Sequence, residues 1–103
     1  MGFRYTGRGK SMTRDEILKK ALQHYGANSQ RIVAIEEMSE LIKELCKVAR
    51  CEENIEHIAE EIADVRIMLD QMIILFDCRN QVDLIESEKL ERLLKRMKFY
   101  GNI

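Results

Sequence analysis

Apolar residues recur at intervals of three and four along two long segments, residues 28–50 and 55–76, which is the spacing of one face of an α-helix. The chain contains no proline, so neither pattern is interrupted by the residue that most strongly breaks helices. The sequence predicts two long helices whose apolar faces form the core. These faces comprise Ala34, Ile35, Met38, Leu41, Ile42, Leu45 and Ala49 in the first segment, and Ile55, Ile58, Ile62, Val65, Leu69, Met72, Ile73 and Phe76 in the second.

Two further segments, residues 13–25 and 83–100, show the same periodicity and are bounded by helix-capping signals. The first segment begins with a capping box at Thr13–Glu16 and ends before Gly26. The second begins with a capping pattern at Asp83 and Glu86 and ends before Gly101. Asn28 or Ser29 can cap the helix predicted for residues 28–50. Four helices joined by short connections predict an all-α fold, an antiparallel helical bundle of about four helices.

The length of 103 residues predicts one helical domain, residues 13–103, preceded by a flexible N-terminal arm at residues 1–12. The arm is basic, contains glycine and has no periodicity. A chain of this size buries a single core with little margin, so association of copies is expected to supplement its stability. We therefore expect a homodimer or homotetramer.

Net charge and cysteine content exclude several classes of partner and location. The formal net charge is -1, so no overall basic field indicates nucleic acid or an anionic membrane as the partner. No uninterrupted apolar run reaches the roughly 18 residues of a membrane span. Three cysteines form neither a disulfide framework nor a zinc motif, which is typical of free thiols in the reducing cytoplasm.

Paired carboxylates border the apolar faces of both long segments. Glu37 and Glu40 are separated by three residues, as are Glu61 and Asp64, so each pair projects from one side of its helix. A single E-x-x-E pair usually lies on a solvated face, but here the pattern repeats on the next helix. Four converging carboxylates repel one another unless a cation lies between them, and oxygen ligands without clustered His or Cys favour Mg²⁺.

Other charged residues near these acids are candidates for catalysis and phosphate binding. Glu36 and Glu40 are candidates for orienting a water molecule, and Lys43, Lys89 and Arg92 for contacting phosphates. These cations also have ordinary structural explanations. Lys43 and Lys47 could each form a salt bridge with an acid one turn away on the helix, and Lys89 and Arg92 could interact favourably with the dipole at the end of their helix. His57, one turn before Glu61, fits either a substrate contact or a structural histidine.

The segments Glu36–Leu41 and Glu61–Val65 resemble the E-E-x-x-E and E-x-x-D motifs of the MazG-like, all-α nucleoside triphosphate pyrophosphohydrolases. The resemblance extends from about Ala21 to Met97. It implies a helical bundle assembled as a dimer or a dimer of dimers, with Mg²⁺ held by Glu37, Glu40, Glu61 and Asp64.

The resemblance also implies an activity: Mg²⁺-dependent hydrolysis of a (deoxy)nucleoside triphosphate to the monophosphate and pyrophosphate, as in clearance of unwanted nucleotides. The chain has no Trp for the base pocket that some members of this family use, so the base is left open. The alternative is a non-catalytic helical module that binds nucleotide or metal, or takes part in an assembly.

Overall fold

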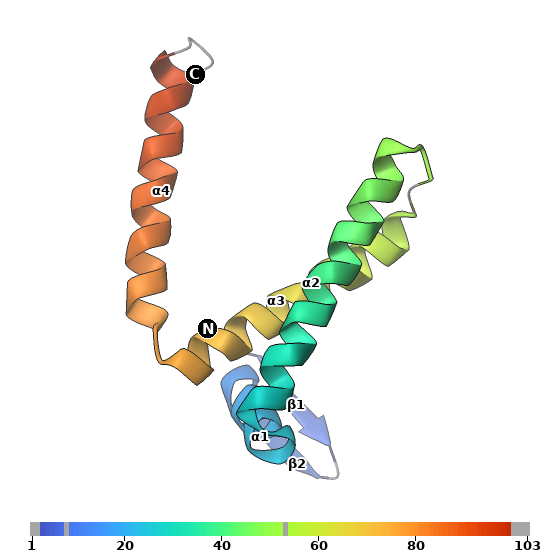
Figure 1. The fold of residues 1–103 in the computed structure, drawn as a ribbon. Coiled ribbons are helices and arrows are strands. Elements are labelled where there is room, and N and C mark those ends of the chain that lie inside the picture. The colour runs from blue at the N-terminus through green and yellow to red at the C-terminus, as the bar shows by residue number, and fades with distance from the viewer. Residues whose placement is uncertain (1–2, 8, 53, 100–103) are drawn as a thin grey trace.

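The computed structural model describes residues 3–7, 9–52 and 54–99, and this part of the chain is mostly helical. The described residues form four helices and a small two-stranded sheet (Figure 1). The elements are β1 (Arg4–Gly7), β2 (Lys10–Thr13), α1 (Arg14–Tyr25), α2 (Ala27–Ala49), α3 (Ile55–Phe76) and α4 (Arg79–Phe99). The mostly helical fold with four helices confirms the coarser part of the fold prediction. None of the described helices combines the length and hydropathy needed to cross a membrane.

The two long helices α2 and α3 run antiparallel and make the most extensive contact in the chain. The side chain of Asn54 accepts a hydrogen bond from the His57 amide at 3.2 Å, which caps the start of α3. At its other end, α3 stops at Asp77, which adopts the left-handed conformation with φ of 49°. This pair of helices forms the framework of the molecule.

The N-terminal residues and α1 pack at one end of this pair (Figure 1). Residues 4–7 pair with residues 10–13 in an antiparallel hairpin, so this arm contains regular structure that its sequence did not indicate. Thr13 and Glu16 form the predicted capping box, with hydrogen bonds of 3.2 and 2.7 Å between each side chain and the other residue's amide. A salt bridge of 2.8 Å between Arg14 and Asp70 joins α1 to α3.

Two predicted helix starts were wrong. Helix α2 begins at Ala27, before Asn28 and Ser29, because Gly26 adopts φ of 90° and lets the chain turn directly from α1 into α2. Helix α4 begins at Arg79, before Asp83, because the Val82 amide already donates to the Cys78 carbonyl at 2.9 Å. The predicted end signal Gly101 lies outside the described residues.

Helix α4 extends away from the rest of the molecule (Figure 1). Its first residue, Arg79, forms a salt bridge of 3.4 Å with Asp15 of α1, and the helix also contacts α3. The radius of gyration is 17.3 Å, whereas a compact domain of this length has a value of about 13 Å. A single chain is therefore extended and leaves much of α4 without a packing partner.

The apolar faces predicted to form the core lie largely at the surface of the single chain. Ile35, Ile42 and Leu45 of α2 are exposed, whereas Gln30, Ala34 and Glu44 are buried. At about 100° per residue, the exposed apolar residues form a strip along α2 that is adjacent to the strip of buried residues. The contact between α2 and α3 is thus centred on the strip that carries the acids. On α3, Ile55, Ile62, Leu69 and Phe76 are likewise exposed.

Candidate metal centre

Polar side chains line the contact between α2 and α3. Gln30, near the start of α2, and Gln71, near the end of α3, are buried, as is Glu44 further along α2. Because the helices are antiparallel, each turn toward the end of α2 meets a turn closer to the start of α3. Three acids of the two predicted motifs, Glu37, Glu61 and Asp64, lie between these positions and are half-buried in this contact. A polar contact of this kind is costly to bury unless its groups find partners.

Three of the four predicted metal ligands come together. One carboxylate oxygen from each of Glu37, Glu61 and Asp64 lies within 4.8 Å of the other two, and all three side chains are half-buried. The sequence analysis expected four acids; Glu40 is exposed and lies outside this group. It is nevertheless close enough for its charge to act on both Glu37 and Glu61.

Burial and mutual repulsion raise the pKa values of two of these acids. Partial burial is the largest cause for Glu37, followed by a hydrogen bond with Asp64 and the charges of its acidic neighbours. Partial burial also leads for Glu61, followed by the charges of Asp64, Glu40, Glu60 and Glu44. The ionised carboxylates therefore destabilise one another, which is the electrostatic condition that a bound cation relieves.

One oxygen in this group lacks any partner. The Oε2 atom of Glu61 is shielded from water and receives no hydrogen bond from any residue that the structure describes. Among the described residues, no lysine or arginine forms a salt bridge with Glu37, Glu61 or Asp64. A hard cation fits this donor set, because Mg²⁺ binds carboxylate oxygens and completes its shell with water and substrate phosphates.

The other predicted site residues lie on α2 and α4, outside the group of three acids. Glu36 and Lys43 are exposed on α2, the helix that carries Glu37. Lys89 and Arg92 lie on α4, which projects away from α2 and α3 (Figure 1), so a single chain does not bring them to the acids.

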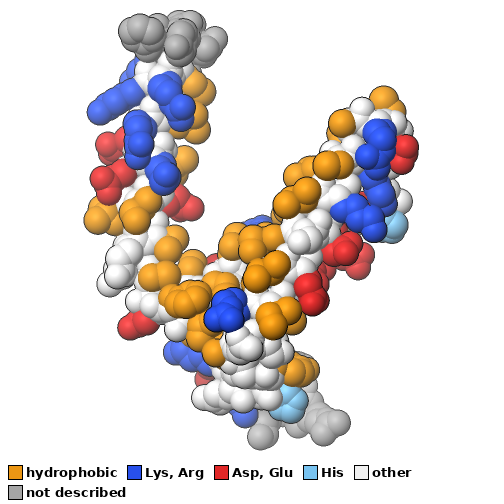
Figure 2. Space-filling model, in the orientation of Figure 1, with side chains coloured by type: hydrophobic (Ala, Val, Ile, Leu, Met, Phe, Trp, Pro, Cys, Tyr) orange, Lys and Arg blue, Asp and Glu red, His pale blue; other side chains and the backbone are white. Residues whose placement is uncertain are grey.

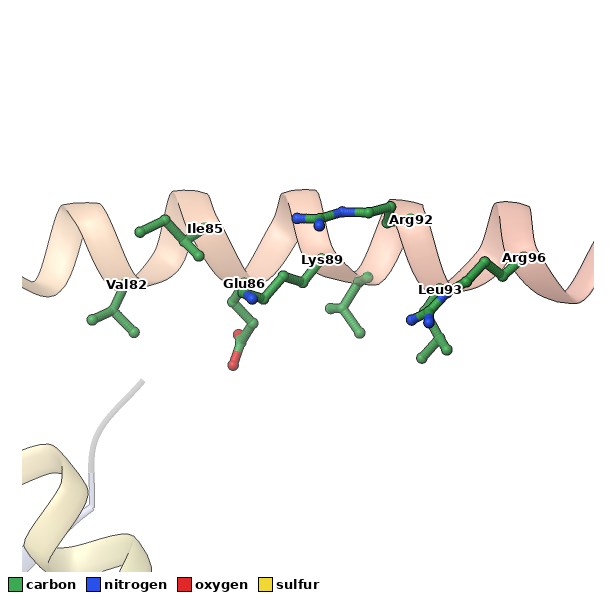
Figure 3. Close-up of a pocket in the computed structure, with 8 residues that line it drawn as sticks. Val82, Ile85, Glu86, Lys89, Arg92, Leu93 and Arg96 are labelled. Carbon is green, nitrogen blue, oxygen red and sulfur yellow. The ribbon is translucent and has the colours of Figure 1, made fainter.

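An open groove along α4 contains both of these cations. Figure 3 shows Lys89, Arg92 and Arg96 beside apolar side chains such as Leu93, and every residue that lines the groove belongs to α4 itself. The groove is therefore one unpartnered face of a helix, on which positive charge lies beside exposed apolar surface.

Sequence reasoning missed one buried acid in the contact between the two helices. Glu44 is only 7% exposed, and its carboxylate lies 3.0 Å from Nζ of Lys47 and 3.9 Å from Nδ1 of His57. The available signal was its spacing, since Glu44 follows Glu40 by one turn and His57 precedes Glu61 by one turn. The acidic strip is thus longer than the two motifs.

No protein-family model, curated protein or solved structure matches this chain.

Proposed function

We propose that this protein is a Mg²⁺-dependent nucleoside triphosphate pyrophosphohydrolase that converts a (deoxy)nucleoside triphosphate to the monophosphate and pyrophosphate. The observation that carries the proposal is the group of Glu37, Glu61 and Asp64, whose oxygens lie within 4.8 Å of one another and include the unpartnered Oε2 of Glu61. The resemblance of the two motifs to the MazG-like enzymes supplies the reaction.

Glu37, Glu61 and Asp64 would hold the metal ion, and Glu40 would join them as the fourth ligand that the resemblance implies. Mg²⁺ bound there would stabilise negative charge developing on phosphate oxygens and lower the pKa of a bound water molecule. The partial burial of these side chains strengthens such electrostatic effects relative to those in bulk water.

In the proposed reaction, the oxygen of a water molecule forms a bond to the α-phosphorus of the nucleotide. The bond from that phosphorus to the oxygen bridging to the β-phosphate breaks, and pyrophosphate leaves. Glu40, which is exposed and close enough for its charge to act on Glu61, would orient this water and accept its proton, and Glu36 is the other candidate. Lys43, also exposed on α2, is a candidate contact for the phosphates.

The partner that we propose is a second copy of the chain, forming a dimer or a dimer of dimers. Exposed apolar side chains occur on α2, α3 and α4, including Ile42 at 62% and Phe76 at 61% exposure. Exposed apolar surface on this scale marks an association site. Packing of these faces would complete a closed antiparallel bundle, in which Lys89 and Arg92 of one copy could reach phosphates bound by another.

The distribution of side chains is compatible with this arrangement. Figure 2 shows hydrophobic side chains along the edge of the α2–α3 pair that faces α4, and charged side chains along the opposite edge. A partner that covered the hydrophobic edge would therefore leave the charged edge open to nucleotide.

We also propose a cytoplasmic location, where nucleoside triphosphates are abundant. Cys46, Cys51 and Cys78 are free thiols, which suits a reducing compartment.

The test is a panel of nucleoside triphosphates and diphosphates incubated with the protein and Mg²⁺, with monophosphate and pyrophosphate measured separately. We expect both products from at least one triphosphate and none when Mg²⁺ is chelated. Glu37→Gln should lower kcat by at least about 100-fold, because it removes a ligand to the metal, whereas Glu88→Gln on α4 should have no effect. Full activity of Glu37→Gln would exclude this site.

The second candidate function is a non-catalytic module that binds nucleotide or metal within a larger assembly. The extensive exposed apolar surface favours this alternative, since it indicates association without requiring catalysis. Calorimetry with nucleotide and Mg²⁺ distinguishes the two functions: binding with no release of pyrophosphate from any triphosphate would identify the module.

A further inference from the structure

A buried acid contacts a lysine and a histidine at one end of the contact between α2 and α3. Glu44 is 7% exposed, and one of its carboxylate oxygens lies 3.0 Å from Nζ of Lys47. Its other oxygen lies 3.9 Å from Nδ1 of His57, which comes from α3. Lys47 is half-buried, whereas the His57 side chain is 62% exposed. This cluster therefore has a buried carboxylate at its base and the accessible nitrogen atoms of Lys47 and His57 at its surface.

The cluster lies next to the candidate metal centre. Glu44 follows Glu40 by four residues on α2, and His57 precedes Glu61 by four residues on α3, which corresponds to about 6 Å along each helix. The charge of Glu44 also contributes to the raised pKa of Glu61, which confirms that the two carboxylates are close. A separation of one helical turn is short enough for a chain of phosphates bound at the metal centre to reach the cluster as well.

Both side chains keep hydrogen-bonding capacity beyond their contacts with Glu44. An ammonium group has three N–H donors, and Nζ of Lys47 forms its ion pair with one oxygen of Glu44. His57 directs Nδ1 toward Glu44, which leaves Nε2 on the other side of its ring.

We propose that Lys47 and His57 bind the terminal phosphates of the substrate, the part released as pyrophosphate, and that Glu44 is the positioning residue that holds both. The inference rests on the proposed function and adds to it a site for the leaving group. It also gives the chain a source of positive charge near the acids that does not depend on α4.

The test measures binding of inorganic pyrophosphate by calorimetry at saturating Mg²⁺, using the full chain. Lys47→Ala and His57→Ala should each weaken pyrophosphate binding by about tenfold, the effect of losing one charge-assisted hydrogen bond. Binding of Mn²⁺ alone, followed by electron paramagnetic resonance, should stay within about twofold of wild type. The matched control is Lys20→Ala, which removes an exposed lysine of α1.

Glu44→Gln separates positioning from simple neutralisation of charge. Removing a negative charge beside a phosphate site should strengthen pyrophosphate binding if charge alone matters, whereas loss of the contacts that hold Lys47 and His57 should weaken it. We expect weaker binding, and tighter binding would refute the positioning role. Because Lys47 and His57 are not buried, their variants test the phosphate site even if Glu44→Gln does not fold.

The results also separate this inference from the proposed function. If wild type hydrolyses triphosphates while Lys47→Ala and His57→Ala bind pyrophosphate as wild type does, the inference fails and the function stands. If both variants lose pyrophosphate binding while wild type hydrolyses no triphosphate, the phosphate site stands and the function fails. Absence of pyrophosphate binding by wild type overturns the inference.

Discussion

Replacing Asp64 by Asn should stabilise the protein when no metal is bound. Asp64 and Glu37 contribute oxygens within 4.8 Å of each other to a group that no lysine or arginine among the described residues neutralises. Asn keeps the shape of the side chain and its ability to hydrogen-bond with Glu37, but removes the negative charge. The variant therefore isolates the electrostatic cost of holding the acids together.

The separation of the oxygens sets the expected magnitude. At 4.8 Å, the upper limit of the separation between these oxygens, two unit charges repel by about 0.9 kcal/mol in water and about 3.5 kcal/mol at the effective dielectric constant near a protein surface. Because both side chains are half-buried, we expect the free energy of unfolding to rise by roughly 1–3 kcal/mol. In a domain of this size, each kcal/mol raises Tm by about 4–8 °C.

The effects of Mg²⁺ and of pH should follow from the same repulsion. Saturating Mg²⁺ should raise the Tm of wild type and leave that of Asp64→Asn nearly unchanged, because the variant lacks one of the metal's ligands. The pKa values of Glu37 and Glu61 are raised in the folded state, so the metal-free folded protein binds more protons than the unfolded chain does. Its stability should therefore increase as the pH falls through these raised values toward about 4.3, the ordinary value for Glu.

The assay is thermal unfolding followed by circular dichroism in chelator and in excess Mg²⁺, with Glu88→Gln as the control for loss of a remote acid. The reasoning is refuted if Asp64→Asn is less stable than wild type in chelator, or if both proteins gain equally from Mg²⁺.

Two further substitutions test the assembly and the backbone. Ile42→Asp should weaken association by at least about 30-fold, as measured by sedimentation equilibrium. The side chain of Ile42 is 62% exposed in the single chain, and burying that surface in an interface contributes about 1–2 kcal/mol in each copy. An unchanged oligomeric state would show that α2 is not part of the interface. Gly26→Ala should lower the free energy of unfolding by about 1–3 kcal/mol in urea titrations. The cause is the backbone conformation, φ of 90° and ψ of 148°, because a Cβ added at this position would meet no other atom of the described residues. A cost below about 0.5 kcal/mol would contradict this explanation.

Local patterns predicted most of the helical structure. The capping box at Thr13 marked the start of α1, and periodicity gave the bounds of α3, because both signals depend on residues close in sequence. The starts of α2 and α4 were missed because backbone conformations at Gly26 and Asp77 decide them. The hairpin was missed because its short strands lack a periodic apolar pattern and were assigned to an arm.

The candidate site could be located from sequence only in part. Spacing placed Glu37, Glu61 and Asp64 on facing helices, and the structure brings them together. Helical periodicity does not reveal which side of an amphipathic helix its neighbour covers. The apolar residues were therefore assigned to the core, whereas the strip carrying Glu44 packs inside and Ile42 stays exposed. The position of Lys89 relative to the acids depends on the direction of α4, which no local pattern sets.

The central claim is that Glu37, Glu61 and Asp64 together hold a divalent cation. Its most direct test is a titration of the metal-free protein with Mn²⁺, with bound ion counted by electron paramagnetic resonance in wild type and in Glu61→Gln. We predict a stoichiometric site in wild type that Mg²⁺ displaces, and loss of that site in Glu61→Gln. Equal Mn²⁺ binding by the two proteins, or none by wild type, would contradict the claim.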